Sequence, residues 1–319
     1  MTLLFRDPQG GLLFPHGSVA CIGAFDGLHL GHRALLRHAQ SRARALGLPV
    51  VAVGFEPLPR EYFARGAEPP RLMLPRAKVQ GLRALGMDAV GLLRFDARLA
   101  SRDAVDFVDT VLVDRLAARE VWVGPEFGFG RGRGGNLSTL KELGLSRGFT
   151  AGEIAPVLEG GERVSSTRIR AALVAGDFKA ANRLLGRPYA LGGRVVRGRQ
   201  LGRTLGFPTA NLRFGGHQPA LTGIHATWVH GLEGPPWPSV SSIGTRPTVG
   251  GVEPLLETHL FDFDGDLYGR HIEVEFVAKL RDEVKFDDLD ALVVQMHRDA
   301  AEARAILETH HPLFQRVTA

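Results

Sequence analysis

The spacing of apolar residues changes near residue 186, and this change constrains the fold more than any other feature of the sequence. Before that point, short apolar runs alternate with stretches of helical periodicity. This alternation is typical of a parallel sheet that helices cover on both faces. After it, short alternating segments are separated by frequent glycine and proline, which is typical of an antiparallel barrel or sandwich. We therefore predict two domains, residues 1–186 and 187–319.

The expected elements follow from this periodicity. In the first domain we predict strands at residues 19–22, 50–55, 89–95, 120–123 and 149–154, and helices at 31–46, 167–175 and 177–185. In the second we predict strands at residues 193–196, 223–229, 240–243, 256–263 and 271–280, and a closing helix at 288–307. Parallel sheets bind ligands beyond the carboxyl ends of their strands, so the loops after the first-domain strands are candidate sites.

Composition excludes several classes of protein. A length of 319 residues fits two domains. A hydrophobic content of 44% excludes wholesale disorder, and a net charge of +5 is too small to argue for a nucleic-acid partner. The sequence has neither an apolar run of the roughly 18–20 residues that a membrane span needs nor a secretory signal pattern. Cys21 is the single cysteine, so we expect a reducing, cytoplasmic location without disulfides or cysteine-built metal sites.

A glycine- and histidine-rich segment lies between the first long apolar strand and the first helix. It reads GAFDGLHLGH over residues 23–32. A glycine turn at a helix start lets backbone N–H groups approach a phosphate. His29 and His32 are three residues apart, so they share a face of the first turn and can stabilise charge on a phosphate chain. The alternative is that both histidines merely cap the turn. The candidate residues are Gly23, Phe25, Asp26, His29, Gly31 and His32.

A second phosphate-binding candidate lies at the start of the helix predicted at residues 167–175. It comprises Ser165, Ser166, Thr167 and Arg168. Hydroxyl groups and an arginine at a helix start form a suitable cradle for pyrophosphate oxygens. The alternative is that the hydroxyl groups only cap the helix.

The second domain contains the segment GRTLGFPTAN at residues 202–211. Its candidate ATP-binding residues are Gly202, Arg203, Gly206, Pro208, Thr209 and Asn211. Thr209 and Asn211 offer neutral oxygen ligands that point the same way on an extended segment, as Mg²⁺ beside substrate phosphates requires. The alternative is an asparagine turn after Pro208. Further along, Glu257 on an apolar strand is either a solvent-facing residue or the base that accepts a proton in phosphoryl transfer.

The motifs H-x-G-H and S-S-T-x-x-R resemble those of the nucleotidyltransferase superfamily. In the second half, G-R-x-L-G-F-P-T-A-N, I-G-x-R-P-T and E-T-H-L-x-D-F resemble riboflavin kinase. Together, over about residues 19–304, the chain resembles the bacterial bifunctional riboflavin kinase/FMN adenylyltransferase family, or prokaryotic FAD synthetases. The resemblance implies a Rossmann-like α/β nucleotidyltransferase domain followed by a small antiparallel β-barrel with a C-terminal helix.

The resemblance also implies substrates and residue roles. The second half is expected to phosphorylate riboflavin with ATP and Mg²⁺, with Glu257 as base and Thr209 and Asn211 as ligands of Mg²⁺–ATP. The first half is expected to transfer AMP from ATP to FMN, releasing FAD and pyrophosphate, with His29 and His32 on the ATP phosphates. The partners implied are these small molecules, with no nucleic acid and no membrane. Flavin contacts are implied for Phe55, Phe127, Phe129 and Arg281, although the phenylalanines would also serve as loop packing.

Four positions depart from the family pattern. Ala24 replaces a common asparagine, Leu58 a histidine, Glu126 an aspartate and His225 a tyrosine. The first three fall in the adenylyltransferase half. They motivate a second hypothesis, an active kinase with a weakened adenylyltransferase. A third hypothesis is a flavin- or nucleotide-binding regulator without turnover.

Overall fold

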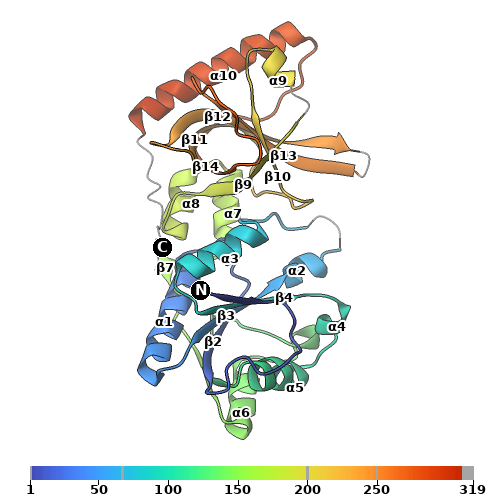
Figure 1. Ribbon diagram of the computed structural model, residues 1–319, viewed down its shortest axis with the longest axis vertical. Coiled ribbons are helices and arrows are strands. Elements are labelled where there is room, and N and C mark those ends of the chain that lie inside the picture. Colours follow the sequence, from blue (N-terminus) through green and yellow to red (C-terminus); the bar gives the residue numbers. More distant parts are fainter. Residues whose placement is uncertain (1, 66–67, 199–200, 249–250, 311–319) are drawn as a thin grey trace. The chain divides into compact units, whose positions relative to one another are not determined.

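The computed structural model describes residues 2–65, 68–198, 201–248 and 251–310 (Figure 1). These residues form two compact units, which divide at Ser165/Ser166, with residues 70–74 joining the second unit. The helices α7 (Ser166–Val174) and α8 (Phe178–Leu185) thus belong with the barrel. The reason is local packing, since Phe178 stacks on Phe276 of a barrel strand with ring centroids 6.1 Å apart. The domain boundary at 186/187 stays a prediction.

The first unit is built on a six-stranded sheet in which every neighbouring pair is parallel, as predicted. The strand order is β1-β4-β3-β2-β5-β6. The strands are β1 (Leu3–Phe5), β2 (Ser18–Ile22), β3 (Val50–Glu56), β4 (Ala89–Arg94), β5 (Ala118–Val123) and β6 (Thr150–Glu153). The order reverses at β2, whose neighbours are β3 and β5, so a ligand crevice is expected at the carboxyl ends of these strands.

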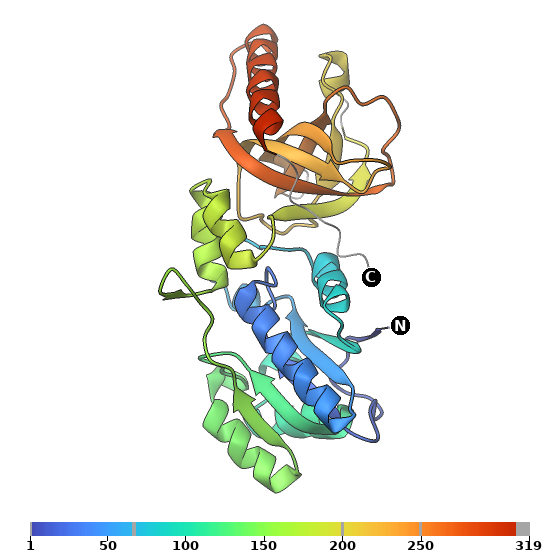
Figure 2. The ribbon, with the colours of Figure 1, turned by 90° about the vertical axis from the view of Figure 1, so that its left-hand side faces the viewer.

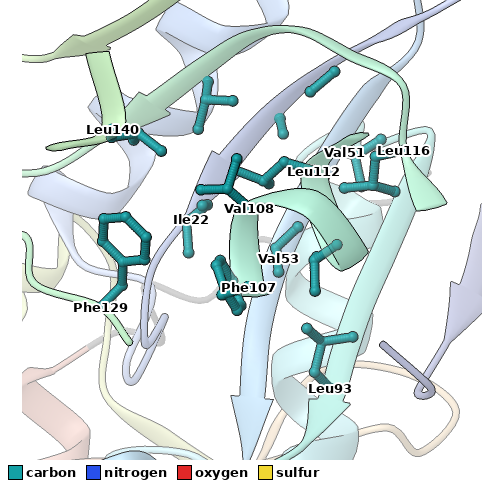
Figure 3. Close-up of a cluster of buried hydrophobic side chains, with 14 of the residues drawn as sticks. Ile22, Val51, Val53, Leu93, Phe107, Val108, Leu112, Leu116, Phe129 and Leu140 are labelled. Carbon is teal, nitrogen blue, oxygen red and sulfur yellow. The ribbon is translucent and has the colours of Figure 1, made fainter. Parts of the chain in front are cut away.

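Helices cover both faces of this sheet. Ala20 and Ile22 of β2 belong to a buried cluster with Val108 and Leu112 of the π-helix η1 (Val108–Arg115) (Figure 3). The alternate residues of β2 point to the opposite face, where α1 (Leu30–Leu46) packs. The remaining elements are α2 (Pro59–Tyr62), α3 (Pro75–Ala84), α4 (Ala97–Ala100), α5 (Ala104–Phe107), η2 (Arg131–Arg133), α6 (Leu137–Arg147), β7 (Leu158–Glu159) and β8 (Glu162–Arg163).

The second unit contains a closed antiparallel barrel (Figure 2). Of the two architectures predicted for this half, the barrel is therefore correct and the sandwich is not. Its order is β10-β13-β12-β11-β14-β9. The strands are β9 (Ala190–Val196), β10 (Ala210–Arg213), β11 (Gly223–His230), β12 (Trp237–Thr248), β13 (Gly251–Leu260) and β14 (His271–Arg281). The short helix α9 (Leu201–Thr204) precedes β10, and the long helix α10 (Leu289–Thr309) packs on β11, β12 and β14.

Hydroxyl groups join β11, β12 and β13 on one buried face of the barrel wall. Thr227 Oγ1 lies 2.7 Å from both Ser239 Oγ and Ser241 Oγ, and Ser241 Oγ lies 2.9 Å from Thr258 Oγ1. Because side chains alternate along a strand, Ser242 and Glu257 project from the opposite face. That face carries the kinase motifs.

Candidate active sites

The loop after β2 brings His29 and His32 into contact. His29 is the N-cap of α1, and its Nδ1 accepts a hydrogen bond from the His32 N–H at 3.3 Å. The two rings stack with centroids 3.7 Å apart and planes 18° apart. The capping alternative is therefore realised for His29, and the predicted shared face is also present. Both rings lie beyond the carboxyl end of β2, at the position where the sheet order reverses.

Gly31 explains why a glycine separates the histidines. A Cβ at this position would lie 3.1 Å from His29 Cε1, so a larger side chain would displace the ring. The same Cβ would lie 3.7 Å from the Val164 carbonyl oxygen. The segment that leads into Ser165 therefore runs beside the histidine motif within the first unit.

His32 is held in its neutral form. Burial lowers the pKa of His32 well below its usual value, and the positive charges of His29, Lys78 and Arg60 add to this effect. Its Nδ1 is buried and has no hydrogen-bond partner among the described residues. A neutral imidazole with an unused nitrogen can donate a hydrogen bond to an incoming phosphate oxygen.

Asp26 of the same loop is fully buried and forms an ion pair with Arg60 of α2, with Oδ2 and Nη2 3.0 Å apart. The neighbouring Phe25 is also buried and places its ring edge toward His32, with centroids 5.4 Å apart. Asp26 thereby links the loop after β2 to the loop after β3. Gly23 lies at the start of this loop, and a Cβ there would meet the Phe25 ring at 3.2 Å.

Ser166, Thr167 and Arg168 form the first turn of α7, which begins one residue before the predicted start, and Ser165 directly precedes it. The spacing S-S-T-x-x-R places its arginine at Arg170, which the sequence reasoning passed over in favour of Arg168. Arg170 is buried and donates a hydrogen bond from Nε to the Pro70 carbonyl oxygen. The motif spacing alone therefore indicates Arg170 as the arginine of this motif.

Phe55, Phe127 and Phe129, predicted from separate segments, line one cavity of about 490 Å³ in the first unit. Phe127 and Phe129 stack with centroids 5.3 Å apart. Sequence reasoning missed the rest of the lining, because these residues come from elements that only tertiary structure brings together. They include Phe63, Phe95, Phe107, Arg60, Arg102 and Arg133. A cavity with phenyl walls and guanidinium groups suits a flat aromatic anion.

In the second unit, three neighbouring strands place two predicted residues and Ser242 on one face. Asn211 of β10 is directly opposite Glu257 of β13, and Glu257 is directly opposite Ser242 of β12. Residues directly opposite in a ladder share a face. Asn211 Nδ2 donates to the Thr209 carbonyl oxygen at 3.1 Å. Thr209, Asn211 and Glu257 are therefore brought together as the sequence predicts.

Asn211 is almost fully buried, yet its Oδ1 has no hydrogen-bond partner among the described residues. Gly198 maintains the space in front of this oxygen, because a Cβ at that glycine would lie 2.7 Å from it. A buried oxygen of this kind needs a partner. The missing partner and the space at Gly198 both fit Asn211 Oδ1 as a ligand for a cation.

Two cavities meet at Thr209. One of about 230 Å³ is lined by Gly202, Thr209, Glu257 and Arg281, and by Leu292 and Met296 of α10. The other, of about 430 Å³, is lined by Arg203, Pro208, Thr209, Asn211 and the loop at residues 263–268. Gly206 follows α9 with φ +81° and completes the turn into Pro208. The smaller cavity has a mainly apolar lining, whereas the larger one is lined by polar side chains that include Arg203 and the Asn211 amide.

Arg281 lines the smaller cavity, but Asp299 of α10 holds its guanidinium. Nε and Nη2 donate to the two Asp299 carboxylate oxygens at 2.9 and 2.6 Å. Gln295 also donates to Asp299, at 2.9 Å. The pair therefore fixes α10 over the cavity. Sequence reasoning assigned the apolar residues of α10 to packing and missed Asp299, which carries no motif signal.

Comparison with known proteins identifies both halves. The family model described as FAD synthetase matches residues 13–168, and the one described as riboflavin kinase matches residues 185–307. The chain is similar to curated proteins named bifunctional riboflavin kinase/FMN adenylyltransferase. It is 45% identical to that of Escherichia coli (strain K12) over 90% of this chain and 92% of the relative. For Pseudomonas fluorescens the identity is 46%, over 91% of this chain and 93% of the relative.

A solved structure from Streptococcus pneumoniae, titled as a macrolide-efflux protein, has a TM-score of 0.76 and 30% identity. It covers 95% of this chain and 98% of its own. Within the part of this chain that the structure describes, no helix is long and apolar enough to cross a membrane.

Proposed function

The chain belongs to the family of bifunctional riboflavin kinase/FMN adenylyltransferases, and from this premise we propose how its residues divide two successive ATP-dependent reactions. The barrel phosphorylates riboflavin to FMN. The parallel-sheet half then transfers AMP from ATP to FMN, giving FAD and pyrophosphate. The partners are thus riboflavin, FMN and ATP, and we assign a cytoplasmic location, where ATP is available.

In the kinase reaction, Glu257 accepts the proton of the riboflavin 5′-hydroxyl as that oxygen attacks the γ-phosphorus of ATP, whose bond to the β,γ-bridging oxygen breaks so that ADP leaves. Glu257 lines the cavity of apolar character, which would take the flavin. Arg203 and Pro208 line the adjoining cavity and bind the ATP phosphates there, with Gly206 in the turn between them. Gly202, also expected to contact ATP, lines the smaller cavity together with Thr209. Thr209 lines both cavities, so it lies where the hydroxyl and the γ-phosphate would meet.

Mg²⁺ fits the oxygen atoms at this junction. Asn211 Oδ1 and Thr209 Oγ1 are neutral oxygen donors, and Mg²⁺ completes its shell with phosphate oxygens and water. Among the described residues no group of three or more histidine, cysteine, aspartate and glutamate side chains gathers as a metal site. Such a cation would neutralise charge on the ATP phosphates. Asn211 and Thr209 would hold it beside Glu257.

In the adenylyltransferase reaction, a phosphate oxygen of FMN attacks the α-phosphorus of ATP and pyrophosphate leaves. His29 and His32 donate hydrogen bonds to the phosphate oxygens, where negative charge develops. Ser165, Ser166, Thr167 and Arg168 bind the departing pyrophosphate. Phe55, Phe127 and Phe129 hold the flavin ring in their cavity. No covalent intermediate with the protein is required.

The observation that carries this proposal is the alignment of Asn211, Glu257 and Ser242 on one face, next to two cavities that meet at Thr209. The first test is a chromatographic time course with riboflavin, excess ATP and Mg²⁺. Conversion to FMN and then to FAD is expected. Formation of neither product would refute the proposal, and FMN accumulating alone would refute its adenylyltransferase half.

Two variants test the division of labour. Glu257→Gln is expected to abolish FMN formation and to spare FAD formation from added FMN. His29→Ala with His32→Ala is expected to do the reverse, with a loss of about 10²–10³-fold in FAD formation. His38→Ala, a histidine further along α1, is the matched control. Equal loss of both activities in either variant would contradict the assignment.

A further inference from the structure

Three arginines line the aromatic cavity of the first unit, and two of them are held by its walls. Arg102 donates from Nη1 to Asp106 at 3.1 Å and to Thr110 at 2.8 Å. Arg133 donates from Nη2 to the Glu126 carbonyl oxygen at 3.0 Å. Arg102 Nε is buried without a hydrogen-bond partner among the described residues, but the Arg102 side chain is only 7% exposed. Both arginines therefore serve the loops and helices that surround the cavity.

Arg60 differs from these two because it contacts the histidine motif. It lies in the loop region after β3, at the second residue of α2. Its Nη2 donates to Asp26, which lies three residues before His29. Arg60 therefore connects the cavity that would hold the flavin with the loop that would hold the ATP phosphates.

The guanidinium of Arg60 also has donors left over. Its Nε is buried and has no hydrogen-bond partner among the described residues. Its side chain lines the cavity and is 36% exposed, so the accessible part of the guanidinium lies at the terminal Nη groups. Asp26, whose side chain is fully buried, fixes one edge of the planar group. A guanidinium fixed on one edge presents the other to an anion, and its fork geometry matches a phosphate.

We propose that Arg60 binds the phosphate of the flavin substrate and thereby selects FMN over unphosphorylated flavin in the first unit. This inference rests on the adenylyltransferase function proposed above. With the ring between the phenylalanines, the phosphate of FMN would reach the edge of the cavity where Arg60 meets Asp26. There it would lie beside the histidines. The same contact orients the attacking oxygen toward ATP, so Arg60 is a binding and positioning residue.

The test compares FMN with lumiflavin, which has the flavin ring but no phosphate and no ribityl hydroxyl groups for the kinase half to phosphorylate. FAD formation from added FMN gives the KM for FMN, and competition against FMN gives the inhibition constant of lumiflavin. Both constants report on the same cavity. Arg60→Gln is expected to raise the KM for FMN by about 10–100-fold and to leave the lumiflavin constant unchanged. Arg60→Lys should recover part of the loss.

Controls separate this inference from the proposed function. Arg65→Gln makes the same charge change at an exposed arginine that does not line the cavity, and its KM for FMN should match that of the wild type. A wild type that forms no FAD refutes the function itself. If the wild type forms FAD but Arg60→Gln weakens FMN and lumiflavin equally, Arg60 only shapes the cavity and the inference is wrong. A change confined to the KM for ATP also overturns it.

Discussion

Substitution of His225 should change how the stability of the barrel depends on pH. This histidine of β11 is fully buried, and its ring makes edge contacts with Phe276 and Phe178 at centroid distances of 5.3 and 5.8 Å. Neither ring nitrogen makes a hydrogen bond of normal geometry to the described residues. Burial lowers the pKa of His225 to about 4, and the charge of Lys279 adds to this, while the Gly223 backbone and Asp282 partly oppose it.

The direction and the size of this pH effect on the unfolding free energy follow from the difference in proton binding between the folded and the unfolded state. In the unfolded chain the histidine titrates near its ordinary value of 6.5, so below that pH the unfolded state binds the proton that the folded state rejects. Stability is therefore highest above about pH 6.5 and falls as the pH decreases toward 4. Between about pH 8 and pH 5 the loss from this one group is about 2 kcal/mol, or roughly 30-fold in the unfolding equilibrium.

The assay is denaturant unfolding of the wild type and His225→Phe at these two pH values, followed by tryptophan fluorescence. Phenylalanine keeps an aromatic ring against Phe178 and Phe276 and removes the titrating nitrogens. All other groups titrate alike in both proteins, so the wild type should lose about 2 kcal/mol more than the variant on acidification. Equal losses would refute the reasoning, as would a histidine resonance, absent from the variant, that titrates near pH 6.5 in the folded wild type.

Further variants test the other contacts. Asn211→Ala should lower FMN formation by about 10²-fold and leave FAD formation from FMN intact; an unchanged kinase rate across a magnesium titration would exclude Asn211 as a ligand. Gly31→Ala should displace His29 and lower FAD formation by about 10²-fold with normal FMN formation, and an unaffected rate would show that the ring position is not critical. Asp299→Asn should cost about 2 kcal/mol of unfolding free energy and raise the KM for riboflavin, because Arg281 loses its carboxylate and α10 loosens; denaturant curves that overlay the wild type would contradict this.

The strands predicted from apolar runs were found where both faces of a sheet are buried. β2 and β3 have five consecutive buried residues each, which makes a continuous apolar run and an unambiguous signal. β1 was missed because it has three residues, of which Leu3 and Leu4 are exposed. β12 is longer than the predicted 240–243 because Pro238 and Pro247 lie within it, and proline argues against a strand in sequence reasoning.

Another boundary failed for a local reason. The strand predicted at residues 256–263 ends at Leu260, because the chain turns at Asp262, which has φ +55°. The predicted strand ran past that turn because Phe261 and Phe263 are apolar, although they are out of phase with the buried Leu256, Thr258 and Leu260. Tertiary contacts hold the turn. Arg304 of α10 forms an ion pair with Asp262, with Nη1 and Oδ2 2.8 Å apart, and lies over the Phe261 ring.

Site residues were predictable where one continuous segment carries the chemistry. The stacked histidines, and Thr209 with Asn211, depend on spacing within a turn or a strand, which the sequence specifies. Arg60 was not predictable as a site residue, because its proposed role depends on the ion pair with Asp26, which lies in the loop after β2. A long side chain at a surface turn carries no signal until the partner that orients it is known.

The departures from the family pattern bear on whether the adenylyltransferase half is weakened. Leu58 is buried, and its backbone N–H donates to Glu61 at 2.9 Å, so it serves the start of α2 and leaves Arg60 oriented. Glu126 is mostly exposed and forms an ion pair with Arg163 at 2.8 Å. Ala24 is exposed beside Phe25, and its side chain contributes no polar group. All three positions are thus occupied by local packing or surface contacts, and the histidine pair and the aromatic cavity form without them. Because transfer to phosphorus depends on those preorganised groups, we expect the three departures to leave FAD formation from added FMN intact.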